Sequence, residues 1–278
     1  MAAASATKHN SAVARPGRQR GRRPRAPTRR ARAAAVGGWG GRVRSTYWTL
    51  LIAAVTAIGL SAIVAVAFAT APPAGRPPID PLLPGFLSLE YAVLAVGVLG
   101  VLAFSSERAT GLIRTTFAAV PRRRAVLAAK AAVAGTVTLI VGELLSFASF
   151  FLVQAILSGH HLGVSLSHPG VPGAVLAEGT LLFVCAMVGL GLGAMIRHTA
   201  GAVAALVALI YLPAILGLLP APWNDRVGRF TLFYAAQQVV ALHPRTELFA
   251  PALSMLVLIA WPAAALLTAA FLITRRDE

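Results

Sequence analysis

Six apolar stretches, each long enough to cross a lipid bilayer, determine what this chain can fold into. A hydrocarbon core about 30 Å thick is crossed by about 20 helical residues. The stretches fall at residues 49–71, 86–104, 131–157, 171–196, 200–219 and 251–273. Because 57% of the residues are hydrophobic and only 12% are charged, the composition is also far from that of soluble domains. The sequence predicts an all-α polytopic membrane protein with six transmembrane helices.

The chain divides into two parts of different composition. Residues 1–38 are rich in Ala, Arg, Pro and Gly without apolar periodicity, and they predict a disordered cytoplasmic tail. Residues 39–278 contain the six stretches and form the predicted transmembrane permease domain. The tail has three interpretations: a solvated extension, a segment attracted to anionic lipids, or a nucleic-acid-binding or organelle-targeting peptide. No aromatic residue precedes Trp39 to stack on bases, so nucleic acid is not an expected partner.

The distribution of positive charge predicts the orientation in the membrane. Cytoplasmic connections carry an excess of Lys and Arg. With six crossings, 21 of these residues fall on the side of the two termini and 4 on the opposite side. The excess persists, at 9 against 4, when the 12 residues before Trp48 are left out. We therefore expect a multi-pass protein of the plasma membrane with both termini in the cytoplasm.

The connection between the fifth and sixth stretches contains a further apolar segment. Residues 230–242 are rich in Phe, Leu and Val. A segment of this length is too short to span the bilayer, which takes about 20 residues. We expect a short helix that lies in the outer interface or forms a re-entrant element.

Motifs for catalysis and metal binding are missing from the sequence. A phosphate-binding Walker loop needs a lysine after Gly-x-x-x-x-Gly, and neither Lys8 nor Lys130 lies in such a loop. The histidines His160, His161 and His168 share one short connection, but no acid or cysteine accompanies them, so no metal site is expected. The chain is therefore expected to lack enzymatic activity and to bind no cofactor itself.

The connection between the second and third stretches carries a charged pattern. Glu107, Gly111 and Arg114 follow at i, i+4 and i+7, which places them on one face of a short helix. Pro121 ends this helix, and Arg123 belongs to the arginine run that follows. One interpretation is an ordinary positive cytoplasmic loop. The other is a rigid charged helix that docks onto a soluble partner.

The order of these residues resembles a known protein family. After an apolar helix, the chain shows Glu107, Thr110, Gly111, Arg114, Pro121, Arg123 and Lys130. This order is similar to that of the permeases of type-2 ATP-binding-cassette exporters. Further similar stretches are residues 44–51, Gly142-Glu143 to Gln154, Gly189 through Gly193 to Arg197-His198, and residues 220–223. The resemblance covers residues 39–278.

The resemblance implies a fold and a mechanism. Such permeases are six-helix subunits that form homodimers or heterodimers and export a substrate by conformational coupling to a separate ATPase subunit, which binds ATP and Mg²⁺. It implies that Glu107 to Arg114 form the coupling helix on that ATPase. It also implies a re-entrant element between helices five and six. Family members usually begin with an amphipathic interfacial helix, whereas residues 36–41 contain four glycines here, each disfavouring a helix by about 1 kcal/mol.

One acidic residue lies well inside the third stretch. A charged carboxylate at mid-bilayer costs about 2.5–3.5 kcal/mol on insertion scales, so Glu143 is expected to face the helix bundle. Three roles fit it: lining a substrate path, hydrogen bonding to a neighbouring helix, or relaying protons. Relaying protons would suit an alternative function, an ion-gradient-driven secondary transporter or channel. Such folds usually have paired halves and several intramembrane charges, and no internal repeat accompanies Glu143 here. The sequence assigns no role to Glu178 in the fourth stretch.

Closely spaced glycines mark the fourth stretch. Gly189, Gly191 and Gly193 lack side chains that would hold another helix at a distance. Such a face can pack inside the bundle or form a seam between two copies of the chain. We favour packing inside the bundle.

Overall fold

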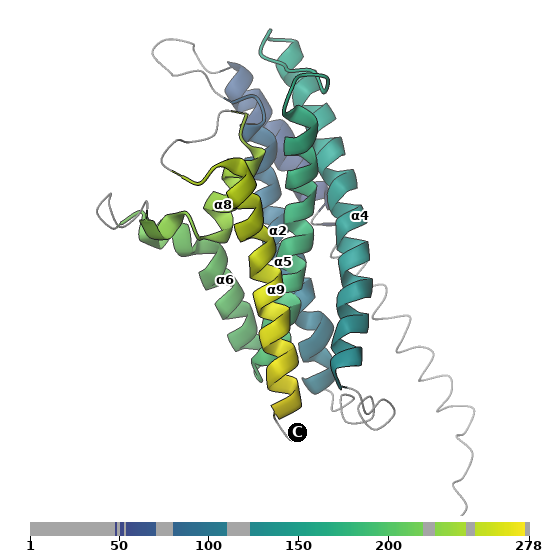
Figure 1. Ribbon diagram of the computed structural model, residues 1–278. Coiled ribbons are helices and arrows are strands. Elements are labelled where there is room, and N and C mark those ends of the chain that lie inside the picture. Colours follow the sequence, from purple (N-terminus) through teal and green to yellow (C-terminus); the bar gives the residue numbers. More distant parts are fainter. Residues whose placement is uncertain are drawn as a thin grey trace, which may run out of the picture. The chain divides into compact units, whose positions relative to one another are not determined.

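The computed structural model describes Trp48, Leu51, Ile52 and residues 54–70, 80–109, 123–218, 226–242 and 248–275. All of these residues belong to one compact unit, Ser45–Glu278. Every regular element in this part of the chain is a helix (Figure 1). The predicted tail and residues 110–122, which include Gly111, Arg114 and Pro121, lie outside the described residues.

Most of the helices follow the predicted apolar stretches. They are Ala54–Thr70, α2 (Leu83–Ala109), α4 (Arg123–Ser158), α5 (Val171–Met195), α6 (Thr199–Leu216), α8 (Leu232–Val240) and α9 (Pro251–Arg275). Five of them, α2, α4, α5, α6 and α9, are long and apolar enough to cross a membrane. The helix Ala54–Thr70 is apolar but shorter within the described residues. The prediction of a helical protein with several membrane-length helices is confirmed.

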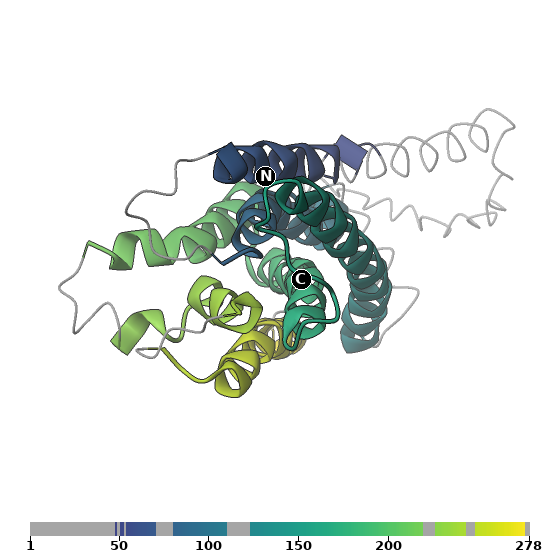
Figure 2. The same ribbon diagram turned by 90° about the horizontal axis from the view of Figure 1, so that it is seen from above.

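Helix α5 is the centre of the bundle. Eighteen of its 25 residues are buried, because it packs against α2, α4, α6, α8 and α9. A helix that is apolar on all sides has no face that prefers water, and it is stable when other helices surround it. In the view from above, α8 and α9 lie on one side of α5 and the helix Ala54–Thr70 lies on the other (Figure 2).

Glycines bring α2 and α5 into backbone contact. A Cβ atom added at Gly189 would overlap the carbonyl oxygen of Gly97, and one added at Gly193 would overlap the carbonyl oxygen of Val101. From the other side, a Cβ atom at Gly100 would overlap the carbonyl oxygen of Ala186. Small residues allow this close approach and so bring the two helices into van der Waals contact. In lipid this contact matters because the hydrophobic effect does not favour the association of helices. These glycines therefore pack inside the bundle.

The two ends of the bundle differ in their polar contacts. At one end, called here the Asp80 end, Oδ2 of Asp80 accepts a hydrogen bond from the backbone N–H of Leu242 at 2.8 Å, and Gln154 donates to the carbonyl oxygen of Pro81 at 3.2 Å. These bonds tie the start of α2 to α4 and to the chain that follows α8. The opposite end, called the Glu107 end, contains the C-terminal ends of α2, α5 and α9 and the N-terminal end of α4 (Figure 1).

Two helix boundaries at the Glu107 end differ from the sequence prediction. Helix α2 continues to Ala109 and includes Glu107, so Glu107 does not begin a separate short helix. Helix α4 begins at Arg123, eight residues before the predicted start of the third stretch at 131. The extension of α2 is a polar turn, and that of α4 has charged residues at both of its ends, so the apolar stretches do not include them. They are stabilised by Lys130, which is bonded to Glu107 across the two helices.

Helix α8 falls within the apolar segment predicted between the fifth and sixth stretches. Thr231 is its N-cap, and its hydroxyl accepts a hydrogen bond from the backbone N–H of Tyr234 at 3.4 Å. The helix packs against α5, α6 and α9. Just before it, the carbonyl oxygen of Phe230 accepts a hydrogen bond from Nε1 of Trp261 at 3.0 Å. The predicted short helix is therefore present and is anchored to α9.

Candidate functional site

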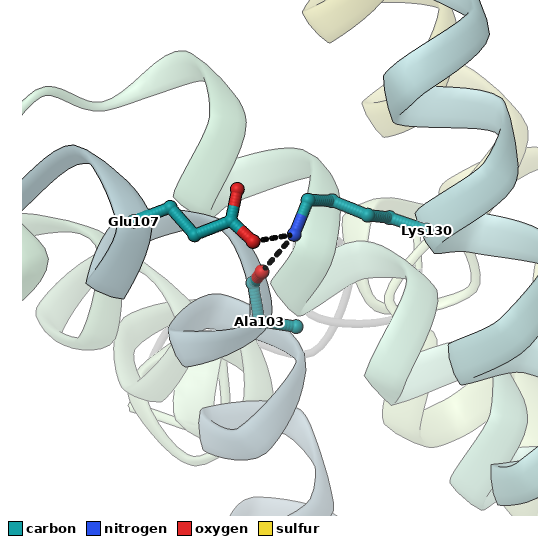
Figure 3. A network of polar contacts seen from close by, with 3 residues as sticks. All are labelled: Ala103, Glu107 and Lys130. Carbon is teal, nitrogen blue, oxygen red and sulfur yellow. Dashed lines mark hydrogen bonds and ion pairs between the residues drawn. The ribbon is translucent and has the colours of Figure 1, made fainter. Parts of the chain in front are cut away.

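A salt bridge joins α2 and α4 at the Glu107 end. Nζ of Lys130 lies 2.7 Å from Oε1 of Glu107 and donates a second hydrogen bond to the carbonyl oxygen of Ala103 at 2.9 Å (Figure 3). The two charged side chains are 21% and 27% exposed. Hydrogen bonds between ionised partners are short and about twice as strong as neutral ones. This pair therefore holds α4 against the last turns of α2.

The next residue of α2, Arg108, is fastened to α5. Its Nη1 and Nη2 atoms donate to the carbonyl oxygens of Ile196 and Ala194, each at 3.1 Å. The last carbonyls of a helix have no partner within the helix and carry partial negative charge, which a cation stabilises. The guanidinium also lies 5.4 Å from the centre of the Phe104 ring, a cation–π distance. Arg108 thus caps the C-terminal end of α5.

Together these contacts form a three-helix connection that we call the α2 junction. It consists of Ala103, Glu107 and Arg108 of α2, Lys130 of α4, and the carbonyls at the end of α5. Consecutive residues of α2 point to different neighbours, Glu107 to α4 and Arg108 to α5. In the sequence, residues 110–122 lie between α2 and α4.

The structure describes only some of the site residues that the sequence predicts in the charged segment between α2 and α4. Glu107 lies in the α2 junction, and Arg123 is the first residue of α4. Gly111, Arg114 and Pro121 lie outside the described residues. Arg108 was not among the predicted site residues. The signal that could have found it is a basic residue in the last turn of α2, although the carbonyls that it caps are distant in sequence.

An apolar pocket of about 490 Å³ lies between α2 and α4 beside the α2 junction. Its walls are made mainly of aliphatic side chains, and Ala186 of α5 contributes to its lining. Lys130 and Ala103 belong both to the pocket lining and to the junction. A change in the separation of α2 and α4 at the junction would therefore change the width of this pocket.

Glu143 of α4 faces α5. Its Oε1 atom accepts a hydrogen bond from the hydroxyl of Thr180 at 3.1 Å. The carboxyl group occupies the notch left by Gly179, where an added Cβ atom would lie 2.7 Å from Cδ of Glu143. The neighbouring Gly142 lies against the carbonyl oxygen of Gly179. The acid is therefore directed into the bundle, as the cost of a charge in lipid requires, and its role stays a prediction.

A second carboxyl group, that of Glu178 in α5, is buried near the first and was given no role by the sequence. Its side chain is 5% exposed, and its Oε2 atom lies 3.3 Å from the hydroxyl of Ser146 in α4. One turn along α4, the hydroxyl of Ser149 is hydrogen-bonded to that of Ser61 at 2.7 Å. Serines three residues apart in one apolar stretch and an acid in the next could have indicated this polar cluster.

The described residues contain no group of three or more His, Cys, Asp or Glu side chains arranged to hold a metal ion. His160, His161 and His168 are exposed in the connection before α5. The thiol of Cys185 is buried in α5 and is not part of a disulfide. Neither the three histidines nor Cys185 forms a cluster of charged contacts comparable to the α2 junction.

Comparison with known proteins does not place the chain in a family. No family model, no curated protein and no solved structure matches it.

Proposed function

We propose that this chain is the membrane-spanning permease subunit of an ATP-binding-cassette exporter in the plasma membrane. It moves a substrate by conformational coupling to a separate ATPase subunit that binds ATP and Mg²⁺, and it works with a second permease copy. The Glu107 end and both termini face the cytoplasm. The helix Ala54–Thr70 belongs to a sixth crossing, and the region of α8 forms the re-entrant element. The basis is the residue order from Glu107 to Lys130.

The observation that most strongly supports this proposal is the α2 junction. A coupling segment must pass a displacement at the membrane surface to helices that line the transport path. The segment 110–122 follows α2 in the sequence, and the last turn of α2 contains Glu107, which is bonded to Lys130 of α4, and Arg108, which is bonded to the end of α5. These charge-assisted bonds fix the geometry of all three helix ends, so a push on the segment is transmitted as a movement of helices.

The mechanism follows from the central position of α5. Closure of two partner ATPases displaces the segment that contains Gly111 and Arg114, and the α2 junction moves with it. Because α5 packs against α2, α4, α6, α8 and α9, a tilt of α5 changes the packing of the whole bundle. ATP can drive the switch only if the partner contacts the segment differently in the two states. The apolar pocket between α2 and α4 is the space that changes width.

The test of this function is purification of the intact complex. The tagged chain, extracted from its native membrane in a mild detergent, is expected to co-purify with a protein that carries a Walker loop and to hydrolyse ATP. Replacement of the Walker lysine in that partner is the matched control and should remove ATP hydrolysis while leaving the complex intact. A chain that purifies without an ATPase and moves solute in proteoliposomes without ATP would contradict the proposal.

A second function is favoured by a different observation, the two neighbouring carboxyl groups of α4 and α5. Glu143 and Glu178 lie on adjacent helices inside membrane-length segments, where ionisable residues often mark ion paths. Such a chain would act alone as an ion-gradient-driven transporter. Transport by the isolated chain that follows an imposed ion gradient and is lost in Glu143→Gln would favour this alternative.

A further inference from the structure

Small side chains on three helices create the apolar pocket between α2 and α4. Its lining includes Gly100 and Ala103 of α2, Ala129 and Ala134 of α4, and Ala186 of α5. The backbone of α2 at Gly100 lies against the carbonyl oxygen of Ala186, so the central helix α5 closes the inner side of the pocket. The volume of about 490 Å³ falls within the range of about 300–1,000 Å³ that is typical of ligand pockets.

The outer side of the pocket opens onto the surface of the bundle. Val133 and Val137 belong to its lining and are 67% and 45% exposed. Both lie in α4, a membrane-length helix, so the medium outside them is the hydrocarbon of the bilayer. A water molecule in a cavity needs polar partners, and the walls here are mainly aliphatic. A hydrocarbon chain is therefore the better occupant of this pocket.

The length of the pocket matches one leaflet of a bilayer. Its lining on α4 runs from Ala129 to Thr138, which is about 14 Å along the axis of an α-helix. The hydrocarbon core of a bilayer is about 30 Å thick, so one leaflet contributes about half of it. The pocket is thus about as long as the region that one acyl chain crosses when its headgroup lies at the Glu107 end.

A positive charge lies at the end of the pocket where such a headgroup would be. Lys130 belongs to the lining, and its side chain is 21% exposed. Its ammonium group has three N–H donors. Among the described residues, Glu107 and Ala103 accept two of these hydrogen bonds, which leaves one N–H for a ligand (Figure 3). At the other end, the hydroxyl of Thr138 donates to the carbonyl oxygen of Ala134 and carries no charge.

We propose that this pocket binds one acyl chain of an anionic phospholipid, with the phosphate at Lys130. Basic pockets between transmembrane helices bind the headgroups of anionic lipids. The described charged residues at the Glu107 end are mostly basic, which favours an anionic lipid over a zwitterionic one. They are Arg108, Arg123, Arg124, Lys130, Arg197 and Arg275, together with Glu107.

The bound lipid has a consequence for the α2 junction. Its phosphate contacts the same ammonium group that is bonded to Glu107, and its chain lies between α2 and α4. The lipid therefore influences how closely these two helices approach each other at the Glu107 end. The proposal rests on the membrane-spanning fold and does not depend on coupling to an ATPase.

The test uses the full-length chain in phosphatidylcholine nanodiscs that contain a small amount of a photoreactive lipid. Two probes carry the same diazirine-labelled acyl chain, one on phosphatidylglycerol and the other on phosphatidylcholine. After irradiation, mass spectrometry of the digested chain identifies the labelled residues. Phosphatidylglycerol is expected to label residues 99–103 and 129–138 about fivefold more than phosphatidylcholine does, because one basic residue near the surface attracts anionic lipids by about 1 kcal/mol. Unlabelled phosphatidylglycerol should compete with the probe in a saturable way.

Substitutions in α4 locate the lipid. Ala134→Leu fills the pocket from its wall, so it should abolish the preferential labelling. Ala132→Leu is the matched control, because Ala132 is exposed on the same helix and lies outside the lining; it should be labelled as the wild type is. Lys130→Gln should make the two probes equal, whereas Lys130→Arg retains the charge and should retain the preference for phosphatidylglycerol.

Several results would overturn the proposal. Equal labelling of the wild-type pocket by both probes would mean that the charge of the headgroup plays no part. Labelling no stronger than that of Ile140 and Leu144, which are exposed on α4, would mean that no lipid is held there, as when a second copy of the chain covers the pocket. Undiminished labelling in Ala134→Leu would place the lipid elsewhere. If that variant does not yield folded protein, an unchanged preference in Lys130→Gln would contradict the proposal.

Discussion

Gly189→Leu is expected to prevent α2 and α5 from packing and to leave little folded protein. Even a Cβ atom at this position overlaps the carbonyl oxygen of Gly97, and a backbone carbonyl cannot rotate away as a side chain can. Overpacking of a core costs about 1–3 kcal/mol when side chains can adjust, so the cost here is about 3 kcal/mol or more. The measurement is the yield of monodisperse protein in mild detergent and its melting midpoint.

The matched control lies in the same helix. Gly173 is exposed near the start of α5, and an added Cβ atom meets nothing within 4 Å. Gly173→Leu should leave both the yield and the melting midpoint close to wild type, because leucine favours a helix over glycine by about 0.5–1 kcal/mol. Gly189→Ala should fall between Gly189→Leu and the wild type. Wild-type behaviour of Gly189→Leu would mean that α2 and α5 do not meet at this glycine.

Glu107→Ala and Gly111→Trp are expected to uncouple ATP hydrolysis from export while leaving membrane insertion intact. The first removes the bond to Lys130 that holds α4 to α2, and the second places a bulky side chain on the face proposed to contact the ATPase. Coupling free energies of about 1–3 kcal/mol correspond to changes of about 5- to 150-fold, so export should fall at least about fivefold. The measurement is ATP-driven transport by the complex in proteoliposomes, with a solute that stimulates its ATP hydrolysis.

Glu107→Gln is the control that separates charge from contact. Its side-chain oxygen can still accept a hydrogen bond from Lys130, so the helix contact is kept and only the ionic part is lost. Transport by this variant should lie between the wild type and Glu107→Ala. If Glu107→Ala and Gly111→Trp both export at the wild-type rate, the charged segment has no part in coupling.

The helices of this fold could be predicted from the sequence because a lipid bilayer permits few backbone conformations for a long apolar segment. A long apolar segment in a bilayer must satisfy its own backbone hydrogen bonds, so the stretch at 171–196 predicted α5, Val171–Met195, within one residue. The end of α2 and the start of α4 were not predicted, because charged residues interrupt the apolar pattern there and their contacts join residues distant in sequence. Lys130, for example, bonds to Glu107 and Ala103.

The candidate sites were less accessible to sequence reasoning. Glu143 was identified because it lies near the middle of an apolar stretch, where a charge is most costly. Glu178 lies closer to the end of its stretch, and its hydrogen-bond partner Ser146 belongs to another helix. Arg108 was overlooked because its partners are backbone carbonyls at the end of α5. Every residue has a backbone carbonyl, so the sequence does not identify which ones a side chain binds. Helices can be predicted from the sequence, whereas contacts between helices that are distant in sequence can be identified only from the folded structure.

The most direct test of the proposed coupling is to find what touches the charged segment in the native membrane. A photo-crosslinking amino acid is placed at Arg114, and at Leu218 as a control on another connection of the chain, where the side chain is 85% exposed. The proposal predicts that Arg114 captures a protein with a Walker loop, identified by mass spectrometry, and that Leu218 does not. Capture only of lipid or of extracytoplasmic proteins at Arg114, with no ATPase in any fraction, would contradict it.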